Sequence, residues 1–361
     1  MNTYDVRSLT QVRLSGRFDA AQEGFPMMWT GASAQMMVRA RTLEAEITSD
    51  YSVLRPYLSF EVDGLRAQFF SPIKGTNWYG VFLGMDPTVA HRVRITLETQ
   101  AFEADPDSYA ALLRLRTDGG FEPLPAPNRK LEFIGDSITS GEGMRGGHDF
   151  SEWVPMCFCA SDTYARLLAD RVNAQYQVIS QSGWGIVNSW DNDLRFNIPD
   201  VYDCICMPAA MERGYGHGGE KPCDFSFDPD AVIVNLGTND AGSIHQEPKP
   251  HPRTGAPYRL TLERMPILEK KSLDFITHLH QVNPHARILW AFGVMASPEC
   301  TLVGQAVRRA VEEAARQGID VVYVPLRDMT EIPDGTGSRS HPGPGAHRDM
   351  ADRLYAALNG D

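Results

Sequence analysis

One serine of the chain occupies a position where a nucleophile is expected. Ser137 follows the apolar run LEFI within Gly135-Asp136-Ser137, where a strand ends and a helical turn begins. A serine at such a strand end can attack a carbonyl carbon, and its own backbone N–H can bind the resulting oxyanion. A Ser/Thr-rich loop that only caps a helix shows the same local pattern. Position alone therefore leaves both interpretations of Ser137 open.

Two further positions offer hydrogen-bond donors for the same oxygen. Gly183 comes after the apolar run 176–180, in the segment QSGWG, and a glycine there lets a backbone N–H approach a ligand closely. Asn239 comes after the run AVIVNLG, and its side-chain amide is a second donor. Donors aimed at a developing negative charge stabilise the intermediate of acyl transfer. Both residues are therefore candidate partners of Ser137.

The end of the chain supplies a candidate base. His341 lies in the loop SRSHPG, which proline and glycine restrict, directly before the last expected helix. An imidazole takes up and returns a proton near neutral pH. Together, Ser137, Gly183, Asn239 and His341 provide a nucleophile, two donors and a base, which is the set that nucleophilic acyl transfer needs.

The first third of the chain predicts an antiparallel β-sandwich. From about residue 11 to 105, short apolar segments alternate with turn residues and show no long helical period. Asp63-Gly64 separates two apolar runs, and this dipeptide favours the type I′ turn of a two-residue hairpin. Many short strands at close spacing are typical of a sandwich. The expected strands are 12–14, 35–40, 43–48, 58–62, 67–70, 79–83 and 93–97.

The rest of the chain predicts an α/β domain. The segment PLPAP at 123–127 interrupts the β pattern, so we place a boundary there and predict domains 1–125 and 126–361. Beyond it, apolar strands alternate with helical patterns, which is typical of a parallel sheet covered on both faces. Ligands bind such sheets at the carboxyl ends of the strands. The expected strands are 131–134, 176–180, 230–236, 287–292 and 321–324, and the expected helices are 162–172, 268–282, 302–316 and 345–358.

Four sequence blocks taken together resemble the SGNH (GDSL-type) hydrolase superfamily. The blocks FIGDSITSG, SQSGWG, VNLGTND and SHPG stand in that superfamily's order, and the resemblance extends over residues 130–358. It implies a three-layer α/β hydrolase domain with Ser137 as nucleophile and His341 as general base. It also implies an oxyanion hole made of the Ser137 N–H, the Gly183 N–H and the Asn239 amide.

A narrower resemblance covers the whole chain. The β-domain that precedes the hydrolase blocks, with the context DPDAVIVNLGTND, is similar to carbohydrate esterase family 2, whose members carry a jelly-roll domain before the hydrolase domain. This resemblance implies removal of acetyl groups from sugar hydroxyls, with a small acetylated sugar or oligosaccharide as substrate. Two alternatives stay open: a lipase, thioesterase or acyltransferase on the same scaffold, and a non-catalytic carbohydrate-binding protein.

One position departs from the wider superfamily. An aspartate usually stands three residues before the histidine, and here that residue is Ser338, which carries no negative charge. Members of carbohydrate esterase family 2 dispense with this aspartate, so the departure agrees with the narrower resemblance. We therefore predict a Ser137–His341 dyad. Either a backbone carbonyl within 337–340 or the carboxylate of Asp334 would orient the imidazole.

Two residues beside the four blocks are candidates for substrate binding. Asp136 directly precedes Ser137, and hydrogen bonding that organises the nucleophile turn is the favoured role for it. Trp184 follows Gly183, and Trp190 is close to it in sequence. Either tryptophan could present an aromatic face to a sugar or an acetyl group, whereas core packing is the structural alternative. We favour a role in the site for Trp184.

Charge narrows the range of partners. The chain has a formal net charge of −12 over 361 residues, so general attraction to nucleic acid or to an anionic membrane is not expected. The first residues contain acids and bases and lack an apolar stretch long enough for a signal peptide or a membrane span. We therefore expect a cytoplasmic protein. The oligomeric state is left open.

Neither the cysteines nor a glycine motif indicates a cofactor. Cys157/Cys159 and Cys204/Cys206 form C-x-C pairs, whereas structural zinc sites usually place two to four residues between cysteines, so we expect no metal. The role of the two pairs stays open. Residues 141–146 satisfy G-x-G-x-x-G, but they do not form the first strand-to-helix turn that a dinucleotide requires.

Overall fold

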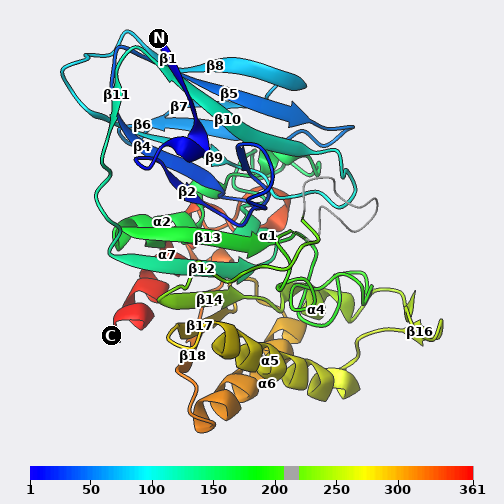
Figure 1. The fold of residues 1–361 in the computed structure, drawn as a ribbon. Helices are drawn as coiled ribbons and strands as arrows, with labels where there is room; N and C mark the ends of the chain where they lie inside the picture. Colours follow the sequence, from blue (N-terminus) through cyan, green and yellow to red (C-terminus); the bar gives the residue numbers. More distant parts are fainter. Residues whose placement is uncertain (207–218, 361) are drawn as a thin grey trace. The chain divides into compact units, whose positions relative to one another are not determined.

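The computed structural model describes residues 1–206 and 219–360, and internal contacts divide the chain into two compact units (Figure 1). The first unit comprises residues 1–127, 154–161 and 203–223, and the second comprises residues 128–153, 162–202 and 224–361. The predicted domains, 1–125 and 126–361, differ from these units because two short segments from the later part of the chain join the first unit.

The first unit contains two antiparallel sheets, which confirms the fold expected for the N-terminal part. Both sheets contribute side chains to one buried core: Met36 and Val38 come from one sheet, and Ala45 and Ile47 come from the other. One sheet has the order β1 (Asn2–Asp5), β10 (Tyr109–Thr117), β5 (Thr42–Asp50) and β8 (Gly75–Leu83), with β3 (Phe25–Pro26) paired to β10. The other has the order β11 (Gly120–Glu122), β4 (Ser33–Arg39), β9 (His91–Leu97), β6 (Leu58–Val62) and β7 (Leu65–Phe70), with β2 (Arg13–Ser15) paired to β4.

The predicted hairpin lies between β6 and β7. Val62 pairs with Leu65, and the two turn residues have φ angles of 50° at Asp63 and 85° at Gly64. Positive φ at both central positions is the type I′ requirement that singled out this dipeptide.

Strand β10 was not predicted from the sequence. Its sequence YAALLRLRT is rich in alanine, leucine and arginine, which favour helices when taken alone. In the fold, β10 lies between β1 and β5, and ion pairs join Arg114 to Glu46 and Arg116 to Glu44 across the strands. Pairing on both edges therefore overrides the local preference.

Buried polar anchors explain why the two later segments group with the sandwich. The carboxylate of Glu98 accepts hydrogen bonds from the Ser161 backbone N–H at 2.9 Å and from the Ser161 hydroxyl at 2.5 Å. The Trp29 indole N–H donates to the carbonyl of Ile205 at 2.6 Å. A buried polar group without a partner would be costly, so these bonds hold both segments against the sandwich.

The second unit is the predicted parallel sheet with helices. The strand order is β13 (Ala174–Ser180), β12 (Arg129–Gly135), β14 (Ala231–Asn235), β17 (Arg287–Phe292) and β18 (Val321–Pro325). The first strand in sequence, β12, therefore has β13 on one side and β14 on the other. Such a reversal of strand order leaves a crevice at the carboxyl ends of the central strands, where α/β proteins bind ligands.

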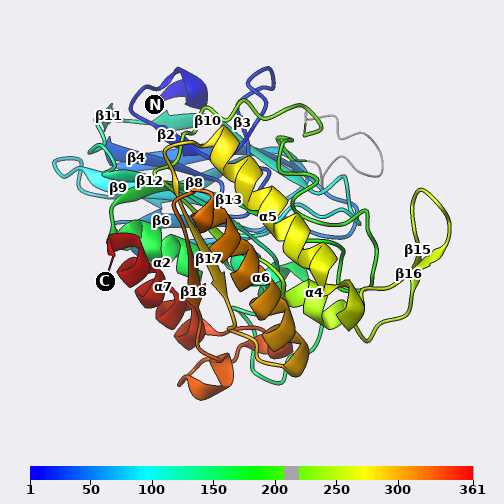
Figure 2. The same cartoon turned by 90° about the horizontal axis from the view of Figure 1, so that it is seen from below.

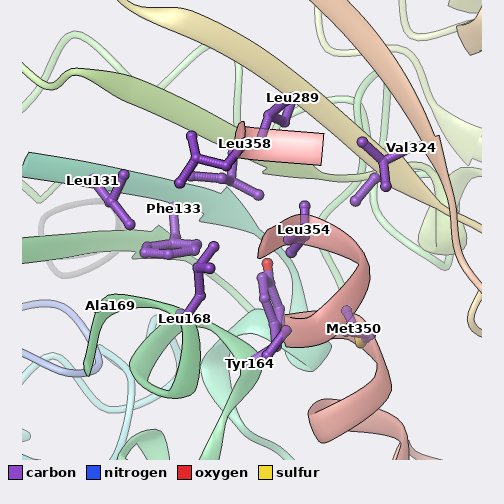
Figure 3. Close-up of a cluster of buried hydrophobic side chains, with 14 of the residues drawn as sticks. Leu131, Phe133, Tyr164, Leu168, Ala169, Leu289, Val324, Met350, Leu354 and Leu358 are labelled. Carbon is purple, nitrogen blue, oxygen red and sulfur yellow. The ribbon is translucent and has the colours of Figure 1, made fainter. Parts of the chain in front are cut away.

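Helices cover both faces of this sheet (Figure 2). On one face, α2 (Tyr164–Arg171) and α7 (Pro344–Asn359) pack against β12 and its neighbours through Phe133, Tyr164 and Leu354, among others (Figure 3). On the other face lie α5 (Met265–Val282) and α6 (Pro298–Arg316). The shorter α1 (Ser137–Ser140) and α4 (Thr238–Ser243) begin at carboxyl ends of strands, and β15 (Lys249–Pro250) pairs with β16 (Pro257–Tyr258). No helix in the described residues is long and apolar enough to cross a membrane.

Candidate active site

The predicted nucleophile lies at the carboxyl end of β12. Asp136 caps the short helix α1, and its Oδ1 accepts a hydrogen bond from the Ile138 N–H at 3.0 Å. Ser137 is therefore the first residue of the helix, and α1 ends at Gly141 in the left-handed conformation with φ of 79°. This tight turn places the Ser137 hydroxyl at the carboxyl end of β12, where the strand order of the sheet reverses.

Ser137 and His341 form a hydrogen-bonded dyad. The Ser137 Oγ lies 3.0 Å from His341 Nε2, and His341 Nδ1 lies 3.0 Å from the backbone carbonyl of Arg339. A carbonyl oxygen only accepts hydrogen bonds, so Nδ1 carries the proton and Nε2 is left to accept the serine proton. The geometry is that of a nucleophile beside its base.

A backbone carbonyl thus takes the place that an aspartate holds in a triad. Of the two groups considered from the sequence, the carbonyl within 337–340 contacts the imidazole, whereas Asp334 forms an exposed ion pair with Arg348 at 3.3 Å. Ser338, at the position of the missing aspartate, is buried and donates its hydroxyl proton to the Arg145 carbonyl at 2.9 Å.

Removal of the Asp334 carboxylate should leave the activity nearly unchanged. We expect Asp334→Ala to retain kcat/KM within about threefold, because its exposed ion pair contributes little and does not touch His341. Steady-state kinetics at neutral pH test this. A loss on the order of 10⁴, the size seen when a triad aspartate is disabled, would restore Asp334 as the orienting group.

The candidate oxyanion donors follow the three adjacent strands. Ser137 follows β12, Gly183 follows β13 and Asn239 follows β14. Within the described residues, the N–H groups of Ser137 and Gly183 donate to no other protein group. The Asn239 side-chain amide donates one proton to the Trp184 carbonyl at 2.9 Å, which fixes its orientation and leaves the second N–H available.

Asp240 holds the loop that carries Gly183. Its buried carboxylate accepts hydrogen bonds from the N–H groups of Ile186 at 2.7 Å and Val187 at 2.8 Å. Burial raises the pKa of Asp240 to about 6 despite these bonds. Asp240 directly follows Asn239 and fixes the loop that carries Gly183. It therefore links the positions of these two candidate oxyanion donors.

Asp136 does not fit the predicted role in substrate binding. Its side chain is completely buried, with an exposure of 0%, and it serves as the cap of α1. It therefore organises the nucleophile turn, as the sequence favoured. Burial raises the pKa of its carboxyl to about 7, and the nearby carboxyls of Asp240 and Glu142 add to the rise.

Because the pKa of Asp136 is raised, the free energy of unfolding should depend on pH. The folded protein holds this proton more tightly than the unfolded chain does, so the contribution of Asp136 to the free energy of unfolding is largest below pH 3.8 and is lost as the pH rises toward 7. Asp136→Asn cannot ionise. Relative to the wild type, we expect its free energy of unfolding to rise by up to about 4 kcal/mol between roughly pH 4 and pH 8. Urea unfolding at both pH values tests this, and a difference independent of pH would contradict it.

The structure also corrects the role predicted for Trp184. Its side chain is only 1% exposed and packs against Phe196 with ring centroids 5.4 Å apart, so it presents no face to a ligand. Trp190 is 52% exposed instead, and its Cδ1 lies 2.9 Å from the place where a Cβ on Gly183 would stand. The exposed indole is therefore the one that lies beside a candidate oxyanion donor.

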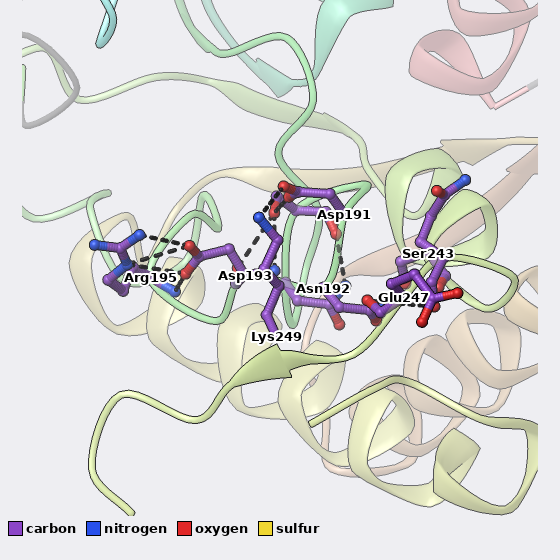
Figure 4. Close-up of polar contacts among 10 residues, drawn as sticks. Asp191, Asn192, Asp193, Arg195, Ser243, Glu247 and Lys249 are labelled. Carbon is purple, nitrogen blue, oxygen red and sulfur yellow. Dashed lines mark hydrogen bonds and ion pairs between the residues drawn. The ribbon is translucent and has the colours of Figure 1, made fainter. Parts of the chain in front are cut away.

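A polar network fixes the loop that bears Trp190 (Figure 4). The buried Asn192 side chain donates to the Ser243 carbonyl at 2.8 Å and accepts from the Leu260 N–H at 2.9 Å. Asp191 forms an ion pair with Lys249 at 3.0 Å. These bonds of the two residues that follow Trp190 fix the loop, while the Trp190 ring stays half exposed.

The glycine run 141–146 also belongs to the site. A Cβ on Gly143 would stand 2.5 Å from the His341 Cβ, and one on Gly146 would stand 3.3 Å from the Ser338 Cβ. These glycines let the loop that carries His341 come close to the segment after α1, which is a different role from binding a dinucleotide. Of the described residues, no group of three or more His, Cys, Asp or Glu could hold a metal ion.

Comparison with known families agrees with this geometry. The sequence model of the GDSL-like lipase/acylhydrolase family matches residues 133–348, which include all four blocks. The chain belongs to this family. The predicted membership of the SGNH (GDSL-type) superfamily is thereby confirmed.

Solved structures are similar to this chain over nearly its whole length, beyond the residues that the family model matches. An acetyl xylan esterase of the rumen bacterium Butyrivibrio proteoclasticus is 32% identical with a TM-score of 0.91, covering 100% of this chain and 99% of its own. A family two carbohydrate esterase of Clostridium thermocellum, in complex with cellohexaose, is 24% identical with a TM-score of 0.78, covering 97% and 98% of the two chains. The predicted resemblance to carbohydrate esterase family 2 and the two-part fold are confirmed.

Among curated proteins, the GDSL-like chain matches a cellulase/esterase of Acetivibrio thermocellus. The identity is 26% over 351 residues, which is 95% of this chain but 39% of that protein. The chain therefore spans about two fifths of the length of this curated relative.

Proposed function

We propose that the chain is an acetylesterase that removes acetyl groups from carbohydrate hydroxyls through an acetyl-enzyme on Ser137. The observation that carries the proposal is the 3.0 Å contact between Ser137 Oγ and His341 Nε2, with Nδ1 held by a carbonyl. This arrangement leaves Nε2 as a base directed at a serine hydroxyl.

The proposed reaction has two halves. His341 takes the Ser137 proton as Oγ attacks the acetyl carbonyl, and the N–H groups of Ser137, Gly183 and Asn239 stabilise the negative charge on the carbonyl oxygen. The sugar hydroxyl then leaves with the proton from His341, and the acetyl group stays on Ser137. Water attacks the acetyl-enzyme in the same way and releases acetate.

Two observations support a carbohydrate ester as the substrate. Structural relatives carry the names acetyl xylan esterase and carbohydrate esterase, and one of them binds cellohexaose. The half-exposed indole of Trp190 beside Gly183 offers an aromatic face of the kind on which sugar rings pack. The net charge of −12 is compatible with a neutral substrate recognised by local groups.

The decisive experiment is acetate release from a panel of acetylated mono- and oligosaccharides, with Ser137→Ala as control. We expect release by the wild type and a loss on the order of 10⁶ in the variant. A preference for long acyl esters or thioesters would favour a lipase or thioesterase, and transfer to an added alcohol in place of hydrolysis would favour an acyltransferase. If p-nitrophenyl acetate gives neither a burst nor turnover, the non-catalytic binding protein is the better description.

A further inference from the structure

An ion pair between the buried Glu142 and the partly exposed Arg339 lies beside the dyad and has no assigned role. Glu142 is 3% exposed, and its Oε1 lies 3.1 Å from Arg339 Nε and 3.8 Å from His341 Nε2. Buried charges are costly unless they are paired, and Arg339 pairs with this one. The carboxylate therefore lies within ion-pair distance of the nitrogen that becomes protonated during the proposed reaction.

The chain fixes Glu142 relative to the nucleophile. Its backbone N–H donates to the carbonyl of Ser137 at 3.0 Å, directly after the turn of α1 ends at Gly141. The position of this carboxylate is consequently set by the same turn that presents the serine. A displacement of the Ser137 backbone would therefore also displace Glu142.

Arg339 connects the ion pair to the other side of the imidazole. Its carbonyl accepts from His341 Nδ1, and its own backbone has φ of 55° and ψ of 31°, a left-handed conformation that is unfavourable for arginine. Three contacts hold this conformation: the backbone N–H donates to Phe150 O at 3.0 Å, Nη1 donates to Ser151 O at 2.6 Å, and Nε pairs with Glu142. The side-chain contacts thus support the carbonyl that orients His341.

We propose that Glu142 and Arg339 are a positioning pair for His341, in which Arg339 anchors the orienting carbonyl and Glu142 supplies the negative charge that favours the protonated imidazole. This inference rests on the proposed Ser137–His341 chemistry. In a triad, one aspartate performs both tasks. Here the two tasks are divided between a carbonyl at Nδ1 and a carboxylate on the Nε2 side.

Other titratable groups near His341 do not supply this charge. His347 on α7 is completely buried, and burial lowers its pKa to about 3, so it is neutral near pH 7. Asp334 is exposed and paired with Arg348. Asp136, at the start of α1, titrates near pH 7, so His341 itself has to be followed to separate the two groups.

Charge substitutions on the two members of the pair should have opposite effects. Glu142→Gln removes the carboxylate and leaves Arg339 positive, so the acid limb of the kcat/KM profile should move to lower pH by about one unit. Arg339→Met leaves the carboxylate beside the imidazole without its partner, so the limb should move to higher pH. The double variant Glu142→Gln/Arg339→Met should return close to the wild type. A pair with only a structural role would not produce shifts of opposite sign.

A third variant separates charge from anchoring. Arg339→Lys keeps the positive charge but replaces the two separate nitrogens that bind Glu142 and the Ser151 carbonyl by one, so kcat should fall about tenfold while the acid limb stays in place. Asp334→Asn is the matched control, since it removes an exposed carboxylate from the same loop, and it should change neither quantity. Rates are normalised to active sites by the acetyl-enzyme burst, which excludes misfolded protein from the comparison.

NMR titration of the His341 imidazole gives the same test without turnover. Wild-type protein that releases no acetate would refute the proposed function, yet the shifts in the His341 titration would still report on the pair. The positioning role is overturned if the titrations of Glu142→Gln and Arg339→Met move in the same direction or do not move.

Discussion

Ser137→Ala should reduce acetate release by a factor on the order of 10⁶, the largest effect expected for a side chain of this site. The hydroxyl is the only group positioned 3.0 Å from His341 Nε2 within the described residues, so no neighbour can form the acyl-enzyme in its place. The substitution removes one oxygen and leaves α1 capped by Asp136, so the variant should fold normally. Acetate release per mole of folded protein is the measurement.

His341→Ala and the double variant complete this test. Because the two side chains act as one unit, the double variant should be about as slow as each single variant, and the losses should not multiply. Residual activity in all three should reflect the oxyanion donors and substrate binding alone. Multiplying losses would show that Ser137 and His341 act independently, which is incompatible with a dyad.

Outside the Ser137–His341 dyad, Asn239→Ala should give the largest effect, a fall in kcat of about 10²–10³, with a small change in KM. The Asn239 amide is fixed by its bond to the Trp184 carbonyl and leaves one N–H for the oxyanion, whose charge is fully developed only in the transition state. Loss of such a donor reduces kcat more than ground-state binding. Initial rates over a range of substrate concentrations separate the two constants.

Asn235→Ala is a matched control for Asn239→Ala. Asn235 lies on β14, and its buried amide donates to the Ala291 carbonyl at 2.9 Å inside the sheet. Its loss should lower thermal stability while leaving kcat per folded molecule close to the wild-type value. If Asn239→Ala raised KM alone, Asn239 would be a binding group and the oxyanion hole would contain only backbone donors.

The sequence predicted the parts of the site that local pattern determines. Ser137, Gly183 and Asn239 each follow an apolar strand, and the carboxyl ends of neighbouring parallel strands meet at one edge, so their grouping follows from periodicity and topology. The hairpin at Asp63-Gly64 was predictable for a similar reason, because few dipeptides accept two positive φ angles.

Features that depend on tertiary context were not predictable. The sequence favoured Trp184 because it follows Gly183, but in the fold Trp184 packs against Phe196 and Trp190 is the exposed indole. Strand β10 has helix-favouring residues and becomes a strand because neighbouring strands pair with both of its edges. The contact between Glu142 and Arg339 joins residues 197 positions apart, and no local motif signals it.

The carbonyl that orients His341 gives this dyad an unusual tolerance of genetic change. A triad that depends on an aspartate side chain is lost through a single codon change at that residue. Here the acceptor is a main-chain oxygen, which every amino acid at position 339 possesses. Side-chain substitutions at position 339 therefore test only the contacts of the Arg339 side chain, because the carbonyl that accepts from His341 Nδ1 is always present. The orientation of this carbonyl depends on two successive left-handed residues, with φ of 55° at Arg339 and 56° at Ser340. Proline fixes φ at about −65°, so a proline at either position would turn the carbonyl away from His341.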